Sequence, residues 1–107
     1  MGKRSKAELS RPDKLIHERG RFLIMTRLAG REDGNTASFT ELKNALGYTS
    51  GNLSIRLKLL AERGYVNIEK RFRDNKPLTT VRLTAKGWKA LDAYIDDMKR
   101  IIDSLKK

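Results

Sequence analysis

The spacing of apolar residues changes twice along this chain, at Gly64 and again after Thr84. Between Leu15 and Leu60, apolar residues recur three or four positions apart within segments that end at glycine-containing turns, as in helices that pack one face on a core. Beyond Gly64, β-favouring residues lie on both sides of a polar turn at residues 73–77, and helical spacing returns after Thr84. We therefore predict an α+β fold that is mainly α, with several helices and one β-hairpin on a shared core.

The 107 residues suffice for one modest core, so we expect a single domain with three parts. Residues 1–12 are basic and lack an apolar period, which predicts a flexible arm. Residues 13–83 carry the short helices and the hairpin. Residues 84–107 are predicted to form one long helix, capped by Thr84, that belongs to the same domain.

Turn residues mark the end of the first helix. Helical spacing from Leu15 to Leu28 predicts this helix, and Gly30 stops it. The turn-forming residues 31–36 follow, and residues 37–39 are predicted to form a short strand.

Two capping signals then define a helix-turn-helix. Ser38 and Glu41 have the spacing of a capping box, in which each side chain accepts a hydrogen bond from the other residue's backbone N–H. This predicts a second helix that runs to Leu46 and stops at Gly47. Thr49 then caps a third helix. Two helices joined by so short a turn form the helix-turn-helix motif.

The formal net charge of +11 makes nucleic acid the first candidate partner, because a small body with this charge attracts polyanions. The chain has no cysteine, which excludes disulfides, thiolate nucleophiles and cysteine-ligated zinc. Its single histidine, His17, cannot form a metal or catalytic site alone, and we expect it at the surface or the edge of the core.

No phosphate-binding loop, catalytic triad or paired-carboxylate site is present in the sequence. We therefore expect a protein that is not an enzyme and that uses neither a metal nor a cofactor. No apolar run approaches the ~18 residues of a membrane span, and the N-terminus lacks an apolar signal core. These features predict a soluble cytoplasmic protein.

Five blocks of the sequence resemble the small winged-helix regulators related to the MarR and ArsR families. The blocks are Asp-Lys-Leu-Ile-His-Glu-Arg at 13–19, Ser-Phe-Thr-Glu-Leu-Lys at 38–43, Thr-Ser-Gly-Asn-Leu-Ser at 49–54, Glu-Arg-Gly-Tyr-Val at 62–66 and Leu-Thr-Ala-Lys-Gly-Trp at 83–88. The resemblance implies a winged helix-turn-helix fold and a cytoplasmic, homodimeric, prokaryotic DNA-binding regulator. The chain departs from the ArsR pattern at Arg56, where many of those proteins have His, and it lacks their metal-binding residues.

The resemblance places DNA contacts on the third helix. The positions that it implies are Thr49, Ser50, Asn52, Ser54, Ile55 and Arg56. Helical rotation gives a similar set, because Leu53, Leu57 and Leu60 share one face that we expect to point inward. At about 100° per residue the outward residues are Gly51, Ile55 and Lys58, with Asn52 and Ser54 on the flanks.

These residue types suit the reading of base edges. Asn52 has the donor and acceptor needed to pair with adenine, Ser50 and Ser54 can donate to a base or a phosphate, and Ile55 can contact a thymine methyl group. Ser, Gly and Asn are also common at helix N-termini, which is an equally simple explanation of their presence. For Arg56, near the buried edge, we predict a phosphate contact, with a tie between the third and second helices as the alternative.

The tip of the predicted hairpin is basic, through Lys70, Arg71, Arg73 and Lys76. Such a tip suits contact with phosphates or with the minor groove. Lysine and arginine also protect exposed strand edges from aggregation, and the two roles are compatible.

The last helix carries a narrow apolar seam with alternating spacings of three and four, formed by Trp88, Leu91, Ile95, Met98, Ile102 and Leu105. This spacing is typical of a coiled-coil-like contact with a second copy. The predicted dimer interface consists of Leu91, Ile95, Met98, Ile102 and Leu105, together with Leu15 and Ile16 of the first helix. Alternatively, Trp88 and Leu91 pack on the domain's own core and only Ile95 and later residues meet a partner.

Together these features predict a sequence-specific regulator that binds double-stranded DNA as a homodimer on a near-palindromic operator. The alternative is a winged-helix module that binds protein or RNA within a larger transcription or replication assembly. The uncharged polar start of the third helix and the basic hairpin favour duplex DNA.

Overall fold

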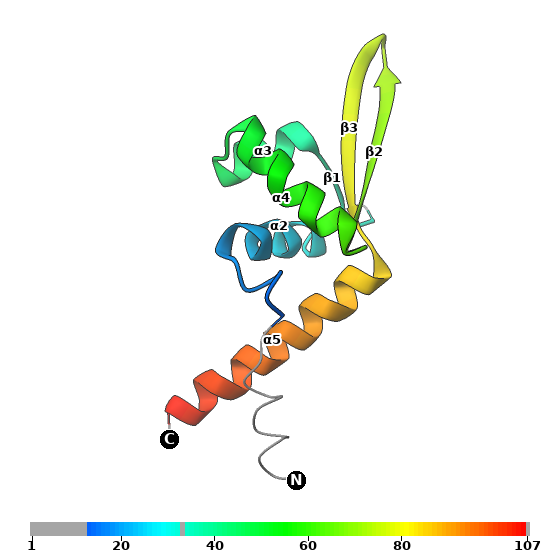
Figure 1. Ribbon diagram of the computed structural model, residues 1–107. Helices are drawn as coiled ribbons and strands as arrows, with labels where there is room; N and C mark the ends of the chain where they lie inside the picture. The colour runs from blue at the N-terminus through cyan, green and yellow to red at the C-terminus, as the bar shows by residue number, and fades with distance from the viewer. Residues whose placement is uncertain (1–12, 33, 107) are drawn as a thin grey trace.

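The computed structural model describes residues 13–32 and 34–106, and the predicted basic arm at residues 1–12 lies outside this part. The elements in chain order are α2 (Arg19–Ala29), β1 (Thr36–Ser38), α3 (Phe39–Leu46), α4 (Ser50–Glu62), β2 (Val66–Arg73), β3 (Lys76–Leu83) and α5 (Ala85–Leu105) (Figure 1). The predicted α+β, mainly helical fold with a helix-turn-helix and a hairpin is confirmed.

Three helices begin at the predicted caps. Ser38 and Glu41 form the full capping box, with both hydrogen bonds 3.0 Å long. The Thr49 hydroxyl accepts a hydrogen bond from the Asn52 N–H at 3.1 Å, and the Thr84 hydroxyl caps α5 in the same way. Because a cap depends on residues only a few positions apart, the local sequence is enough to place these helix starts.

The first helix begins later than predicted, at Arg19 instead of Leu15. The Glu18 carboxylate caps α2 by accepting hydrogen bonds from the N–H groups of Gly20 and Arg21, each 2.9 Å long. The Asp13 carboxylate binds backbone N–H groups in the turn before it, at 2.9 Å from Leu15. The predicted helical start is wrong because these two carboxylates satisfy the backbone in a turn.

A three-stranded antiparallel sheet has the order β1-β3-β2. The predicted short strand is confirmed, one residue earlier, as β1, which pairs with the lower part of β3. Strands β2 and β3 pair from Val66–Leu83 to Arg73–Lys76. The two residues between them, Asp74 and Asn75, have φ of 54° and 63°, as a tight two-residue hairpin turn requires. In Figure 1 the paired strands project well beyond the helices.

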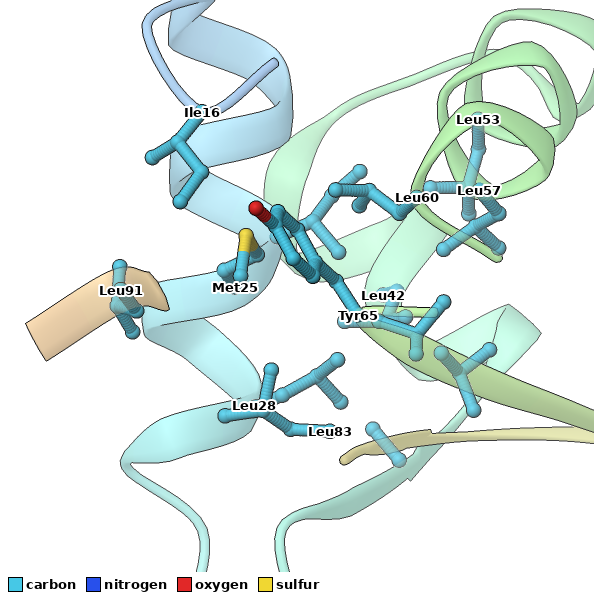
Figure 2. Packing of buried hydrophobic residues seen from close by; sticks show 14 residues of the cluster. Ile16, Met25, Leu28, Leu42, Leu53, Leu57, Leu60, Tyr65, Leu83 and Leu91 are labelled. Atoms are coloured by element: carbon cyan, nitrogen blue, oxygen red, sulfur yellow. The ribbon is translucent and has the colours of Figure 1, made fainter. Parts of the chain in front are cut away.

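The core lies where α2, α3 and α4 meet the base of the hairpin, and the N-terminal half of α5 closes it from below (Figures 1 and 2). Its largest fully buried side chains are Ile16, Ile24, Met25, Leu28, Leu42, Leu53, Leu57, Leu60, Leu91, Val66 and Val81. The Tyr65 hydroxyl donates to the Asp13 carboxylate at 2.6 Å and so fastens the turn before α2 to the hairpin base.

Two residues of the predicted dimer interface belong to this core. Ile16 is 0% exposed and Leu91 is 1% exposed, so neither side chain offers surface to a second copy. Their predicted interface role is wrong: Ile16 turns inward from the Asp13 turn, and Leu91 lies on the side of α5 that faces the body. Trp88, the other residue of the own-core alternative, is instead 46% exposed.

Helix α5 is held against the body along its first half and extends away from it along its second (Figure 1). Tyr94 contacts the Phe22 ring, with centroids 5.4 Å apart, and its hydroxyl hydrogen-bonds to His17 Nδ1 at 2.8 Å. His17 is exposed, as expected. Beyond Tyr94 the apolar residues become steadily more exposed, reaching 80% at Leu105.

Candidate nucleic-acid interface

Helix α4 is amphipathic in the way that its sequence predicts. Leu53, Leu57 and Leu60 point into the core. The opposite side is exposed, and its residues, with the Thr49 cap, are Thr49, Ser50, Gly51, Asn52, Ser54, Ile55 and Lys58. The structure therefore leaves seven of the eight residues predicted on this helix exposed.

Two residues on this side have no packing role in the monomer. Ile55 is a large apolar residue that is nonetheless 66% exposed. A Cβ added to Gly51 would meet nothing within 4 Å, so the fold does not need glycine there. Ile55 is an exposed apolar side chain, and Gly51 leaves the helix backbone accessible beside it. This combination is expected where another molecule packs closely on the helix.

Arg56, the eighth residue, is turned away from this side. Its Nε and Nη2 atoms donate to the two Glu18 carboxylate oxygens at 3.2 and 3.0 Å, and its guanidinium lies over the Tyr48 ring, 5.1 Å from the centroid. The side chain crosses Gly20, where any Cβ would overlap it. The predicted phosphate contact is therefore wrong for this arrangement, and the predicted tie reaches the start of the first helix instead of the second.

The ion pair between Arg56 and Glu18 stays charged over a wide pH range. Burial alone would raise the pKa of Glu18, but hydrogen bonds from Arg56 and from the N–H groups of Gly20 and Arg21 outweigh it and lower the pKa to about 2. The same contact raises the pKa of Arg56. The Arg56–Glu18 ion pair thus links α4 to the start of α2, and it remains charged at physiological pH.

The four predicted basic residues of the hairpin are all exposed: Lys70, Arg71, Arg73 and Lys76. Side chains alternate between the two faces of a strand, so Lys70 lies on one face of β2, and Arg71 and Arg73 lie on the other. Arg71 also pairs with Glu69, its neighbour two positions earlier on the same face. The hairpin therefore presents cations on both faces and at its tip.

A groove of about 690 Å³ separates α4 from the hairpin. Leu57, Ala61 and Ile68 supply apolar surface, and Lys58 from α4 and Lys70 from β2 stand beside it. One carboxylate, Glu62, also lines the groove. Ile68 is 38% exposed because the groove leaves it uncovered. A backbone with apolar sugars and anionic phosphates matches this combination of surfaces.

The sequence reasoning missed both the groove and Phe72, which is 77% exposed near the hairpin tip. Ile68, Lys70 and Phe72 recur at every second position, so the alternation of strand side chains carried the signal that they share a face. Without the structure, that face could not be assigned to the α4 side of the hairpin.

Two features are absent from residues 13–32 and 34–106. No group of three or more His, Cys, Asp and Glu residues in this part could hold a metal ion. Nor does any helix in it combine the length and the apolar character needed to cross a membrane.

A helix-turn-helix followed by a β-hairpin that stands beside its second helix defines the winged-helix class; α4 has the position of the recognition helix in this class, and β2–β3 that of the wing. A family model described as a winged helix DNA-binding domain matches residues 21–102. The chain belongs to this winged-helix DNA-binding domain family.

Related chains support the assignment. An uncharacterized protein of Methanocaldococcus jannaschii is 32% identical over 88 residues, which are 82% of this chain and 92% of that one. The structure of a transcriptional regulator homologue from Pyrococcus horikoshii superposes with a TM-score of 0.84 at 27% identity, covering 94% of this chain and 96% of the other.

The predicted resemblance to MarR-type regulators is confirmed at the level of the fold. A MarR family transcriptional regulator of Streptomyces coelicolor, solved in complex with DNA, has a TM-score of 0.65 at 19% identity. The match covers 86% of this chain and 62% of that protein.

Proposed function

We propose that this protein is a MarR-type transcriptional regulator that binds double-stranded DNA sequence-specifically, as a homodimer on a near-palindromic operator, in the cytoplasm of a prokaryote. One observation carries the proposal: the exposed polar side of α4 and the basic wing lie on either side of one groove. The family to which the chain belongs supports the same function.

In this proposal α4 enters the major groove. Ser50, Asn52 and Ser54 supply hydrogen-bonding groups for base edges, and Ile55 supplies an apolar contact for a thymine methyl group. Gly51 and the Thr49 cap bring the start of the helix close to the DNA. Base contacts of this kind distinguish sequences, whereas contacts with phosphates do not.

The basic residues beside α4 position the protein on the backbone. Lys58 and Lys70 stand at the groove, and Arg71, Arg73 and Lys76 extend along the wing. The net charge of +11 adds a long-range attraction that is independent of sequence. Arg56 contributes indirectly, since it holds α4 against α2.

The second copy is proposed to cover the end of α5. Ile101, Ile102 and Leu105 are 39%, 50% and 80% exposed, which leaves an apolar surface that a monomer does not bury. Ile95 and Met98 continue this surface toward the body. Leu15, in the turn before α2, is half-buried. A contiguous exposed apolar stripe is typical of a subunit interface.

A gel-shift competition tests the function. We expect a labelled duplex from a random pool, enriched by selection on the protein, to be displaced by the same duplex and not by its separated strands or by structured RNA. Preferential displacement by RNA would point instead to the RNA-binding alternative. Failure to retain any duplex at low salt would contradict the proposed function.

A further inference from the structure

Phe72 is an aromatic residue in a place where the fold gives it nothing to pack on. It lies on β2, two residues before the hairpin turn, and is 77% exposed. The anchored part of the hairpin ends at Val66 and Val81, the last buried residues on β2 and β3 toward the tip. Removal of an exposed phenylalanine side chain from water is favourable, so a partner that covers Phe72 gains binding free energy.

The strand register shows which way Phe72 points. Residues directly opposite each other share a face, and the pairs on this face are Val66–Leu83, Ile68–Val81, Lys70–Thr79 and Phe72–Pro77. Ile68, Lys70 and Thr79 line the groove beside α4. Phe72 and Pro77 therefore continue the groove face of the wing outward to its tip.

The tip is built to hold this apolar pair in place. The two-residue turn at Asp74 and Asn75 makes Arg73–Lys76 the hydrogen-bonded pair that closes the hairpin. Pairs alternate along an antiparallel ladder, so Phe72 and Pro77 form a non-hydrogen-bonded pair, in which the missing N–H of proline breaks no bond.

Basic residues lie on both faces of the wing tip. Lys70 shares the face of the Phe72 ring, and Arg71, Arg73 and Lys76 lie on the opposite face. An apolar group amid positive charge suits a polyanion with an apolar interior, which is the chemistry of a nucleic-acid duplex. A hydrophobic protein surface would not explain the cations.

We propose that Phe72 inserts into the minor groove of the bound duplex as an apolar wedge and partly unstacks one base step. This inference rests on the proposed function. From Ile68, at the groove beside α4, four residues of strand span roughly 13 Å. That reach carries the tip across one phosphate backbone, from a major groove about 12 Å wide into the neighbouring minor groove of about 6 Å. Inserted apolar side chains of this kind kink the duplex by roughly 20–90°.

The test measures affinity and bending together. The probe is a duplex of about 30 base pairs rich in TA steps, which unstack easily, with a donor and an acceptor dye at its two ends. Wild type is compared with Phe72→Ser, which removes the wedge, and Phe72→Leu, which keeps an apolar one. Since the ring is exposed, thermal unfolding of both variants should match that of wild type.

We expect Phe72→Ser to weaken binding about ten-fold and to abolish the energy-transfer change, and Phe72→Leu to retain most of both. Phe72→Ser should leave the salt dependence of binding unchanged, because no charge is lost. Binding and bending equal to wild type would overturn the wedge while leaving the proposed function intact, as would a wild type that binds without bending. A wild type that binds neither this probe nor the duplex enriched by selection overturns the proposed function itself.

Discussion

Arg56 illustrates how a charged side chain on a recognition helix can serve the fold instead of the ligand. Its guanidinium is held by both oxygens of Glu18 and by the Tyr48 ring. Glu18 at the same time caps α2, so one carboxylate fixes a helix start and the position of a second helix. Loss of either partner should therefore affect stability first and DNA binding second.

Glu18→Gln tests this coupling through pH. The folded pKa of Glu18, about 2, lies below its usual 4.5, so the charged form stabilises the fold above about pH 4.5 and loses this effect as the pH falls toward 2. Since the pair is partly exposed, we expect the variant to be about 1–2 kcal/mol less stable at neutral pH. Urea unfolding at pH 7, 5 and 3 measures this gap, which should shrink only below about pH 4.5. A gap of constant size would show that the charge of Glu18 is irrelevant.

Asn52→Ala tests the reading of bases. The side chain is exposed, so stability should not change, while binding to the selected duplex should lose about 1–3 kcal/mol. Random duplex should bind as before. Fluorescence anisotropy on both duplexes measures the difference, with Lys58→Ala as the control that weakens both alike. Equal losses on both duplexes for Asn52→Ala would remove its role in specificity.

For single residues, the sequence predicted those interactions that join residues close together in the chain. The caps at Ser38, Thr49 and Thr84 involve residues three positions apart. The bond between Glu18 and Arg56 joins residues 38 positions apart and depends on how two helices pack, so the sequence alone gave no way to choose it over a phosphate contact. The role of Gly20, which makes room for Arg56, is hidden for the same reason.

Among the elements, the wing has features that the sequence predicted well, and one feature, the face that meets α4, that the sequence did not predict. Turn chemistry and β-favouring residues located the hairpin and its basic tip. The face that meets α4 follows from the packing of the hairpin base on the core, so the place of Ile68 and Phe72 became known only from the structure.

Replacing Arg73 and Lys76 together by Ala tests the electrostatic part of the wing. If six or more phosphates are neutralised, wild-type affinity should fall roughly 10³-fold or more between about 50 and 200 mM salt. The double variant should weaken all duplexes similarly and reduce the slope of log affinity against log salt by up to about 2. Titrations at four salt concentrations give the slope, and an unchanged slope would place these two residues away from the DNA.

The junction between the wing and α5 depends on a close approach at Gly87. A Cβ at this position would overlap the Tyr65 carbonyl oxygen and press on Leu83, both at the hairpin base. We expect Gly87→Ala to destabilise the fold by about 1–3 kcal/mol, because the backbone must shift. Gly51→Ala is the matched control, since its Cβ meets open space, and alanine there should be neutral or slightly stabilising. Thermal unfolding compares the two, and equal midpoints would contradict the close contact.

For the whole molecule, one core accounts for a compact body with two projections, the wing and the end of α5 (Figure 1). The sequence predicted both projections, because the wing has the residue pattern of strands and α5 has the apolar spacing of a helix. It could not tell how far the body covers α5, and Leu91 proved to be core while Ile102 and Leu105 are exposed. The boundary between the buried and the exposed part of α5 depends on where α2 and the Asp13 turn pack against α5.

The end of α5 is left uncovered by the body, with Ile102 50% and Leu105 80% exposed. Replacing Ile102 and Leu105 by Asp puts two charges on the apolar surface, where a dimer would have to bury them unpaired. Both residues lie beyond the core, so the winged-helix body should stay folded. A second pair of substitutions, Ala93→Asp with Ser104→Asp, adds the same charge at exposed positions on the side of α5 away from Ile102, and it controls for electrostatic repulsion from DNA.

We expect wild type and the control pair to sediment as dimers at micromolar concentration, and the Ile102–Leu105 variant as a monomer. A dimer would set two copies of α4 about 34–36 Å apart, one turn of DNA, so that both halves of a near-palindrome are read at once. The monomer engages one half, and its affinity for the selected duplex should fall well below that of the control. If the variant stays dimeric, or if wild type sediments as a monomer, the end of α5 is not a dimer interface. Its exposed isoleucines and leucine would then bind a different partner.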